Sequence, residues 1–409
     1  MPSKKCFART FAHLFVLAAT FVVSDALSAA ADYRVLHAFG QGKDGGGVFA
    51  GLARDTKGNL YGTTWSGGAY GYGTVFELTP GSRGRWTETI LHNFCKDFPH
   101  CTDGALPSTT PVLDPSGNLF GTSNSATFEM SQRSSGWTFN VICDCITPSA
   151  VDADGNLYGI GGGRQLAGGV DELLAGSDGW RERRLYSFCS QPGCRDGDFP
   201  EWGLSWDASG NLYGTTEFGG NSDNQSCPTS GGCGVAYKLA RGTDGHWTHQ
   251  VLHRFGAFSN DGQLPYEENL TVDSKGNVYG TTLYGGIGGT VFELSPRQDG
   301  SWKETILYNF ANFQTNGGAP VGGVTFDNLG NLYGTASAGG DPTCSCGVVF
   351  KMTPQADGKW TYTVLHRFKG TDGYGPGYNL IFDSGYKHLY GTTAAGGSGG
   401  YGVVYEITP

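Results

Sequence analysis

Apolar and polar residues along the chain form short segments with strand character. Four such segments follow one another at 51–55, 59–64, 73–80 and 86–94. Each is rich in β-branched or aromatic residues and is bounded by Gly, Pro, Asp or Ser, which predicts strands joined by turns. Beyond the first 31 residues, no stretch spaces its apolar residues three and four apart, so we expect little helix.

The second of these segments recurs along the chain. The phrase D-T-K-G-N-L-Y-G-T-T around Asn59 returns until a last copy, H-L-Y-G-T-T, begins at His388. The steps from Leu60 to Leu389 are 59, 38, 55, 66, 54 and 57 residues, and a period of this length predicts an array of similar structural units. The intermediate copies are centred on Asn118, Asn156, Asn211, Asn277 and Asn331.

Four short antiparallel strands repeated seven times predict an all-β fold, a seven-bladed β-propeller. The last copy stops at 403–409, where its third strand ends, and 33–39 match the fourth-strand pattern L-H-x-F. We therefore expect the N-terminal strand to complete the last blade, which pairs two sheet edges. The predicted domains are a secretory signal peptide at 1–31 and a single propeller at 32–409.

The first 31 residues carry the signal-peptide pattern. Lys4, Lys5 and Arg9 precede an apolar core at 14–23 and small residues at 29–31. No later segment is long and apolar enough to span a bilayer. We expect a secreted monomer that is periplasmic, extracellular or associated with the cell surface.

The ten cysteines that follow Cys6 fall into close pairs, which predicts disulfides in a secreted protein. The two C-x-C pairs leave the connectivity open, because so small a ring is strained. Structural zinc needs four converging ligands, and these pairs lack partnering histidines, so we expect no metal and no cofactor. The pairs are Cys95/Cys101, Cys143/Cys145, Cys189/Cys194, Cys227/Cys233 and Cys344/Cys346.

Charge excludes some partners. Without Lys4, Lys5, Arg9 and Asp25, 24 basic and 36 acidic side chains remain, a net charge of −12. Nucleic-acid binding needs a basic footprint, so we expect no nucleic-acid partner.

Two kinds of loop share one face of a propeller: the links between second and third strands, and the links from blade to blade. The former are long, variable and Gly-rich, and the cysteines lie in or beside both kinds. We call this the loop face and expect any functional surface there, because binding residues concentrate on loops held by a rigid scaffold. Its aromatic residues are candidates for stacking on sugars or anchoring a partner, or they cover neighbouring glycines. They are Trp65, Tyr70, Tyr72, Phe218, Tyr284 and Tyr401.

The blade-to-blade links carry a second candidate set, the D-G and N-G dipeptides. Their side-chain oxygens either ring the channel mouth and hold a cation or polyol, or serve ordinary turns, which we favour. These residues are Asp44, Asp103, Asp196, Asp261, Asn316 and Asp372. A further repeated set shares one fourth-strand position, which we interpret as structural packing between blades: His37, His92, His253 and His366, with Tyr186 and Tyr308 in other blades. The D-x-x-G-N phrase lacks the Gly and Glu of a helix–loop–helix calcium site and predicts a tight turn.

The string G-N-L-Y-G-T-T, then G-T-V-F-E-L-T-P, W-T-x-T-V-L-H-x-F and D-G-x-x-P resembles the GloVer tandem-repeat family, the choice-of-anchor exported repeat proteins. The likeness covers essentially all of the chain after the signal peptide. Blade two departs from it with a short link at 122–127, and blade three with V-D-E-L-L at 170–174. The resemblance implies an exported bacterial repeat protein and assigns no catalytic residue.

We therefore expect a binding or interaction module that takes a glycan or a surface protein through its loop face. The alternative is an extracellular polysaccharide-active lyase or hydrolase, on fold analogy alone, and a purely structural envelope component is a third possibility. A deep pocket with convergent acids that depart from the repeat would favour the enzyme, and a shallow aromatic surface would favour binding.

Overall fold

The computed structural model describes residues 31–40, 42–124, 126–162, 167–200, 203–220, 227, 231–266 and 269–409. Ala31–Pro409 form one compact unit. The predicted signal peptide, apart from Ala31, lies outside the described residues. No helix among the described residues is long and apolar enough to cross a membrane.

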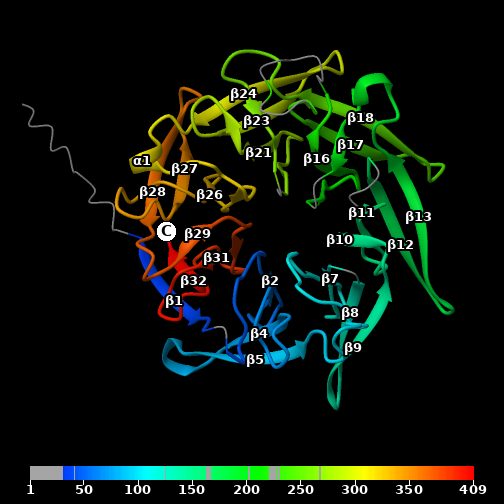
Figure 1. Cartoon of the computed structure of the whole chain (residues 1–409). Helices are drawn as coiled ribbons and strands as arrows, with labels where there is room; N and C mark the ends of the chain where they lie inside the picture. Colours follow the sequence, from blue (N-terminus) through cyan, green and yellow to red (C-terminus); the bar gives the residue numbers. More distant parts are fainter. Residues whose placement is uncertain are drawn as a thin grey trace, which may run out of the picture. The chain divides into compact units, whose positions relative to one another are not determined.

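Seven sheets arranged in a ring make the unit a seven-bladed β-propeller, which confirms the predicted fold (Figure 1). Blade one contains β2 (Ala53–Arg54), β3 (Leu60–Thr64), β4 (Thr74–Pro80) and β5 (Trp86–Asn93). Blade two contains β6 (Val112–Leu113), β7 (Leu119–Ser123), β8 (Ala126–Arg133) and β9 (Gly136–Cys143). Blade three contains β10 (Ile146–Val151), β11 (Leu157–Gly161), β12 (Gly169–Gly176) and β13 (Gly179–Ser187).

The other blades repeat this order. Blade four contains β15 (Ser205–Trp206), β16 (Leu212–Phe218), β17 (Val235–Arg241) and β18 (Trp247–Arg254), with β14 (Asp198–Pro200) also on β16. Blade five contains β20 (Thr271–Val272), β21 (Val278–Thr282), β23 (Thr290–Pro296) and β24 (Trp302–Asn309), beside a ribbon of β19 (Gly262–Gln263) and β22 (Tyr284–Gly285). Blade six contains β25 (Thr325–Phe326), β26 (Leu332–Ala336), β27 (Val348–Pro354) and β28 (Trp360–Arg367).

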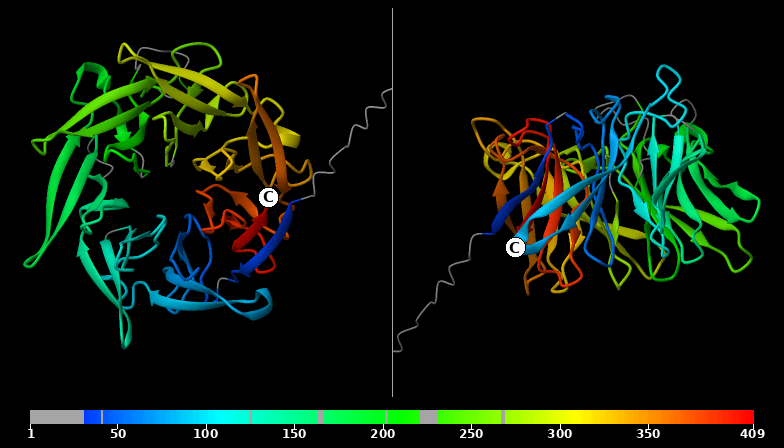
Figure 2. Two further views of the ribbon diagram at one scale, coloured as in Figure 1. Left: turned by 180° about the vertical axis from the view of Figure 1, so that it is seen from behind. Right: turned by 90° about the horizontal axis from the view of Figure 1, so that it is seen from below.

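Blade seven closes the ring as predicted. It contains β30 (Ile381–Phe382), β31 (Leu389–Ala395) and β32 (Val403–Thr408), with β29 (Tyr374–Pro376) also on β31. The N-terminal strand β1 (Asp32–Ala38) is its fourth strand, in antiparallel register from Asp32 opposite Thr408 to Ala38 opposite Val403. In Figure 2 the blue first strand lies beside the red last one. Both ends of the domain are therefore held in one sheet.

The repeated D-x-x-G-N-L-Y phrase forms the turn between the first and second strands. Asp55 accepts the backbone N–H of Asn59 at 2.8 Å and its side-chain amide at 2.9 Å, and Tyr61 donates its hydroxyl to the same carboxylate at 3.2 Å. This confirms the turn interpretation. Helix among the described residues is limited to α1 (Phe313–Asn316) and the short 3₁₀ turns Ser82–Gly84 and Pro192–Cys194.

One cross-strand pair recurs within the blades and contributes to the cores between them. In six blades an aromatic side chain of the third strand stands opposite a branched aliphatic one of the fourth, as Phe76 stands opposite Ile90. The ring of Phe76 covers Gly62, where an added Cβ would overlap it, so this second-strand position needs glycine. The other pairs are Phe128/Val141, Tyr237/Val251, Phe292/Ile306, Phe350/Val364 and Tyr405/Val35. Blade three instead places Asp171 opposite Arg184.

Both kinds of link meet on the loop face, as predicted. Leu106, in the link from blade one to blade two, donates its N–H to the carbonyl of Tyr72 at 2.8 Å. Gly47 makes the same bond to Tyr401 across the ring closure, also at 2.8 Å. At these two interfaces the blade-to-blade link is therefore held by the second-to-third link of the preceding blade.

Candidate functional site

The D-G and N-G residues bind side chains of the outer strands. Asp103 receives a hydrogen bond from the backbone N–H of Cys95 and lies 2.9 Å from Nε2 of His92 on β5. Tyr186 donates its hydroxyl to Asp196 at 2.7 Å. Since the fourth strand is the outermost of each sheet, these side chains lie at the outer strands and not at the channel mouth. This geometry supports the turn interpretation, and a ligand-binding role for these residues stays a prediction.

The predicted aromatic residues are dispersed over the loop face. Tyr401 packs over Gly46, Phe218 packs over Gly231, and Tyr72 lies 5.5 Å from the ring of Phe98. Tyr70 and Tyr284 are exposed, and neither lines a cavity that the described residues form. Of the predicted aromatic set, Trp65 is the member that lines the main cavity.

All five predicted disulfides are formed, including the two C-x-C pairs. They link Cys95 to Cys101, Cys143 to Cys145, Cys189 to Cys194, Cys227 to Cys233 and Cys344 to Cys346. Every pair is local, so each fixes the shape of one loop.

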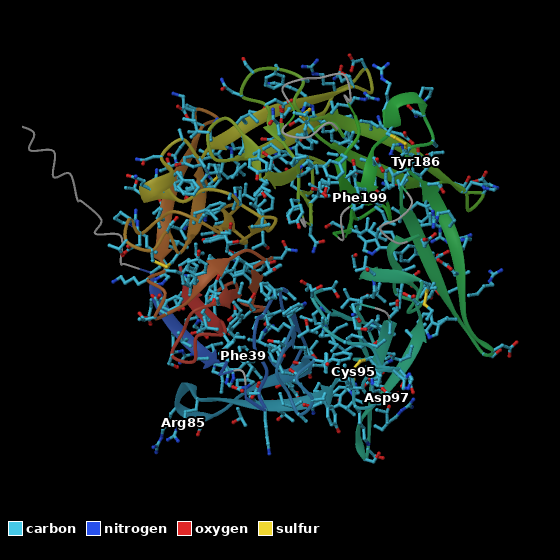
Figure 3. All side chains as sticks on the ribbon, in the orientation of Figure 1. Phe39, Arg85, Cys95, Asp97, Tyr186 and Phe199 are labelled. Carbon is cyan, nitrogen blue, oxygen red and sulfur yellow. A yellow bond between two sulfur atoms is a disulfide. The ribbon has the colours of Figure 1, made fainter. Side chains whose placement is uncertain are left out.

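A cavity of about 970 Å³ opens on the loop face around blades two and three. Figure 3 shows one of its lining residues, Phe199, nearer the centre of the ring than Tyr186. A smaller cavity of about 70 Å³ adjoins it and shares three of its threonine and serine residues. Aromatic, hydroxyl and charged side chains line the main cavity, among them Trp65, Phe199, Tyr266, Ser108, Thr109, Thr122, Thr127, Thr147, Asn124, Asp144, Glu182, Glu217 and Arg184.

Two missing loop segments leave this space open. β9 ends at Cys143 and β10 begins at Ile146, so only Asp144 and Cys145 connect blades two and three. The corresponding link between blades five and six runs from 310 to 324. Within blade two, Ser123 and Ala126 already pair across the second-to-third link, which is therefore short as well. The cavity occupies the place where the other blades carry both loops.

A charged pair replaces the aromatic–aliphatic pair in the adjacent blade. Asp171 forms an ion pair with Nε of Arg184, and their side chains are 1% and 39% exposed. Burial raises the pKa of Asp171, the nearby Glu182 raises it further, and the Arg184 guanidinium opposes this shift. The second carboxylate oxygen of Asp171 is buried without a hydrogen-bond partner among the described residues. The cavity wall therefore combines an exposed guanidinium with a fully buried carboxyl group behind it.

Comparison with known proteins agrees with this architecture. Residues 288–409 match the Gloeobacter/Verrucomicrobia repeat family. This part of the chain therefore carries the Gloeobacter/Verrucomicrobia repeat. The match covers blades six and seven and the end of blade five, so the cavity-forming residues of blades one to four lie outside it. No curated protein matches the chain.

Solved structures similar to this chain share its fold at low identity. YCF48 from Cyanidioschyzon merolae superposes with a TM-score of 0.51 at 12% identity, over 92% of this chain and 99% of that one. A protein from Lactobacillus plantarum gives a TM-score of 0.50 at 14% identity, over 82% of this chain and 88% of that one. At this identity the likeness shows the fold alone.

Sequence reasoning missed Asp144, Asp171, Glu182 and Arg184 as site residues of this repeat protein. The signals were present: the shortest step of the repeat, 38 residues, spans the two missing loop segments. The unusual V-D-E-L strand marks Asp171. Connecting them required the register that places Asp171 opposite Arg184, at the edge of the space that the loops leave.

Proposed function

We propose that the protein is exported and binds a carbohydrate in the cavity at blades two and three. The predicted signal peptide and the five disulfides support export to an oxidising compartment. The binding proposal rests on one observation: two shortened loops, a charged pair and a cavity all lie at blades two and three. Its volume of about 970 Å³ lies at the upper end of the range for ligand pockets.

The chemistry of the lining suits a saccharide. Trp65, Phe199 and Tyr266 offer ring faces on which the apolar face of a sugar can stack. The surrounding Thr, Ser and Asn side chains can donate to and accept from sugar hydroxyls. A concave site of this kind fits a small ligand better than the flat surface of a folded protein.

The charge of the cavity lining indicates which saccharides can bind. Asp144, Glu182 and Glu217 line the cavity, and Arg184, also in the lining, is already paired with Asp171. The remaining negative charge disfavours an anionic ligand, because like charges in a concave site repel strongly. We therefore propose a neutral or amino sugar rather than a polyuronate.

The test is a panel of neutral, amino and acidic oligosaccharides, screened on an array and then titrated by calorimetry. The double variant Asp171→Phe/Arg184→Ile restores the side chains of the other blades and removes the cavity guanidinium. We expect it to weaken binding by about 30-fold or more, as for loss of a hot spot. Tyr70→Ala, outside the cavity, should bind like the wild type. Equal affinity in the double variant, or preference for acidic sugars, would contradict the proposal.

Enzymatic cleavage is the second candidate, and the acids of the cavity favour it. Asp144 lies in the shortened link between blades two and three, and Asp171 departs from the repeat. Any bound polysaccharide should be incubated with the protein and the products separated by chromatography. If cleavage occurs, Asp144→Asn, Glu182→Gln or Glu217→Gln should abolish it and leave binding in place. Binding without products would reject the enzyme and keep the binding module.

A further inference from the structure

One fourth-strand position governs how neighbouring blades meet on their outer side. At four interfaces it carries an aromatic ring that stacks on the His or Tyr of the preceding blade. Phe139 stacks on His92 with ring centroids 3.8 Å apart, and Tyr362 stacks on Tyr308 at 3.9 Å. The other two stacks are Tyr33 on His366 and His249 on Tyr186. Glutamate takes this position at three interfaces. Glu304 lies between blades four and five and Glu88 between blades seven and one, each facing a histidine. The third is Glu182, between blades two and three, where Cys143 takes the place of the histidine.

Between blades four and five, Glu304 joins a His–Asp pair. Nε2 of His253 lies 3.2 Å from both carboxylate oxygens of Asp261 and 3.5 Å from Oε2 of Glu304. The Asp261 and Glu304 side chains are 0% and 3% exposed, and that of His253 is 13% exposed. The backbone N–H of Ala257 donates to Asp261 at 2.7 Å and fixes that carboxylate. Three ligand-type atoms from two blades thus converge in a nearly dry space.

The Glu304 carboxylate has no hydrogen-bond donor in this arrangement. Both of its oxygens are buried without a hydrogen-bond partner among the described residues, and no ion pair with Lys or Arg is described for Glu304 or Asp261. Burial, together with the adjacent Asp261, raises the pKa of Glu304. Two buried carboxyl groups beside a single histidine are stabilised either by a proton or by a further positive charge.

The interface between blades seven and one holds a second copy. Nε2 of His37 lies 3.6 Å from Asp44 and 3.6 Å from Glu88. Nε2 of His37 and Oε1 of Glu88 are both buried without a hydrogen-bond partner among the described residues. Burial raises the pKa of Glu88 to about 8 and lowers that of His37.

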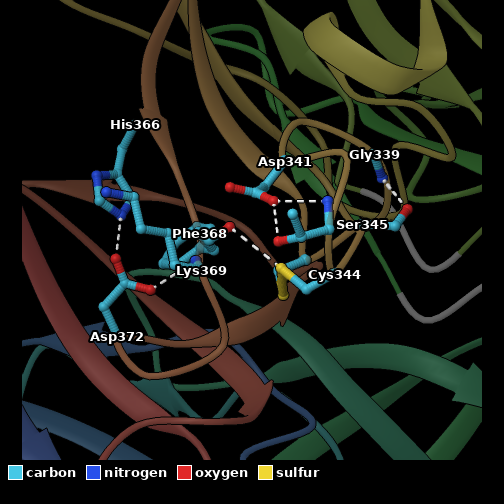
Figure 4. The surroundings of a disulfide bond; sticks show 10 residues. Gly339, Asp341, Cys344, Ser345, His366, Phe368, Lys369 and Asp372 are labelled. Atoms are coloured by element: carbon cyan, nitrogen blue, oxygen red, sulfur yellow. Dashed lines mark hydrogen bonds and ion pairs between the residues drawn. A yellow bond between two sulfur atoms is a disulfide. The ribbon is translucent and has the colours of Figure 1, made fainter.

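The separation between His and Asp differs between the two kinds of interface. Where an aromatic ring is present, the separation has direct hydrogen-bond length. Nε2 of His92 lies 2.9 Å from Asp103. Nε2 of His366 lies 3.0 Å from Asp372 (Figure 4). Where glutamate faces the histidine, Nε2 lies 3.2 Å from Asp261 in His253 and 3.6 Å from Asp44 in His37, and the glutamate oxygen lies at 3.5–3.6 Å. Ligand atoms about 2.1 Å from a tetrahedral ion lie about 3.4 Å from one another. The separations at these two interfaces are compatible with ligand atoms around one ion.

We propose that His253, Asp261 and Glu304 bind a divalent transition-metal ion of the Zn²⁺ class, with a second copy at His37, Asp44 and Glu88. Imidazole nitrogen with carboxylate oxygen selects such ions over Ca²⁺ and Mg²⁺, which take oxygen ligands. Two carboxylates and a neutral histidine balance the charge of the ion. Each site joins two blades, and the second includes the N-terminal strand that closes the ring. Cysteine, which the sequence analysis considered as the metal ligand, takes no part, because every pair is oxidised.

Metal content and Zn²⁺ titration test this proposal. The purified protein is dialysed against a chelator and titrated with Zn²⁺ by calorimetry in two buffers that differ in ionisation enthalpy. We expect two equivalents of Zn²⁺ per chain, with proton release at neutral pH, and little heat with Ca²⁺ or Mg²⁺. Glu304→Phe and Glu88→Phe should each remove one equivalent. Both should fold, because an aromatic ring occupies the same position at other interfaces.

A variant that creates a third metal site tests the proposal independently of the two variants that each remove one. His92 and Asp103 are already paired at the interface where Phe139 stacks, so Phe139→Glu completes the set of three side chains there. A folded Phe139→Glu protein should bind three equivalents of Zn²⁺. Failure of the wild type to retain Zn²⁺, or a stoichiometry that neither Glu→Phe variant lowers, would overturn the proposal. In that case Glu304 and Glu88 are held as neutral carboxylic acids.

Discussion

The interface between blades five and six and the interface between blades two and three are built from the same repeat and differ in almost every contact. Between blades five and six, Tyr308 stacks on Tyr362, and Phe350 stands opposite Val364 in a core that reaches from Tyr279 to Met352. Between blades two and three, the buried core consists of Phe120, Ile146, Leu157 and Leu173. The first interface is closed by packing, and the second contains a cavity.

The difference shows how a closed ring can tolerate a weakly packed interface. Blades two and three do not have to hold themselves together by packing, because β1 and β32 pair at the other side of the ring and fix its circumference. At one interface, polar groups can therefore replace the aromatic–aliphatic pair, and loop residues can be absent. In a repeat protein, functional residues are to be sought where a single unit departs from the others.

The largest expected loss of stability comes from placing an aspartate, the blade-three residue, at the aromatic position of a regular interface. Phe350→Asp buries an unpaired carboxyl group and leaves a cavity at a fully buried site, which should cost about 4–5 kcal/mol of unfolding free energy. Urea denaturation followed by tryptophan fluorescence measures this. Phe350→Tyr is the matched control, since Tyr237 and Tyr405 occupy the same position, and it should cost less than about 1.5 kcal/mol. A loss below about 2 kcal/mol in Phe350→Asp would show that the aromatic pair does not carry the interface.

A smaller effect is expected from breaking the pair in blade three. Arg184→Ile leaves Asp171 buried and unpaired and should cost about 2 kcal/mol at neutral pH. This is less than for a fully buried pair, because Arg184 is 39% exposed. Chemical denaturation at several pH values measures it.

The same variant has a defined pH dependence. Arg184 now opposes the raised pKa of Asp171, so its loss should raise that pKa further. A carboxyl group whose pKa is higher in the folded than in the unfolded state takes up a proton on folding. Stability should therefore be greatest below the unfolded pKa of about 4 and fall as the pH rises through the folded pKa. A variant whose stability rises with pH over this range would contradict the assignment.

Most of the fold could be predicted from the sequence, because the same pattern of strand and turn residues recurs in the blades. The closing strand was predictable because 33–39 repeat the L-H-x-F pattern that the last copy lacks. The candidate site was harder to predict from the sequence, because the cavity lies where loop residues present in other blades are missing. The short step before Leu157 signals a deletion, but only the register and the loop contacts show which space it opens. The Glu88 and Glu304 positions were equally hidden, since each site combines residues from two blades.

The C-x-C disulfides offer a matched pair of probes for the two kinds of interface. Cys143→Ser/Cys145→Ser acts in the short link beside the cavity, and Cys344→Ser/Cys346→Ser acts in a loop between regular blades. Loop-closure entropy for such small rings predicts a loss of about 1.5 kcal/mol in each. Saccharide affinity should fall only in the first, because Cys145 lines the cavity. Equal loss of affinity in both would place the ligand elsewhere.

The smallest expected effect on stability distinguishes a functional pair from a structural one. Asp171→Phe/Arg184→Ile replaces a buried ion pair by the apolar pair of six other blades, and such replacements are neutral or stabilising by about 1 kcal/mol. The unfolding free energy should therefore stay the same or rise, while the binding assigned to the cavity is lost. Because stability does not require Asp171 and Arg184, their presence would then be explained by the ligand. A destabilisation of about 2 kcal/mol or more would instead show that the surrounding blade has adapted to the charged pair, and that its role is structural.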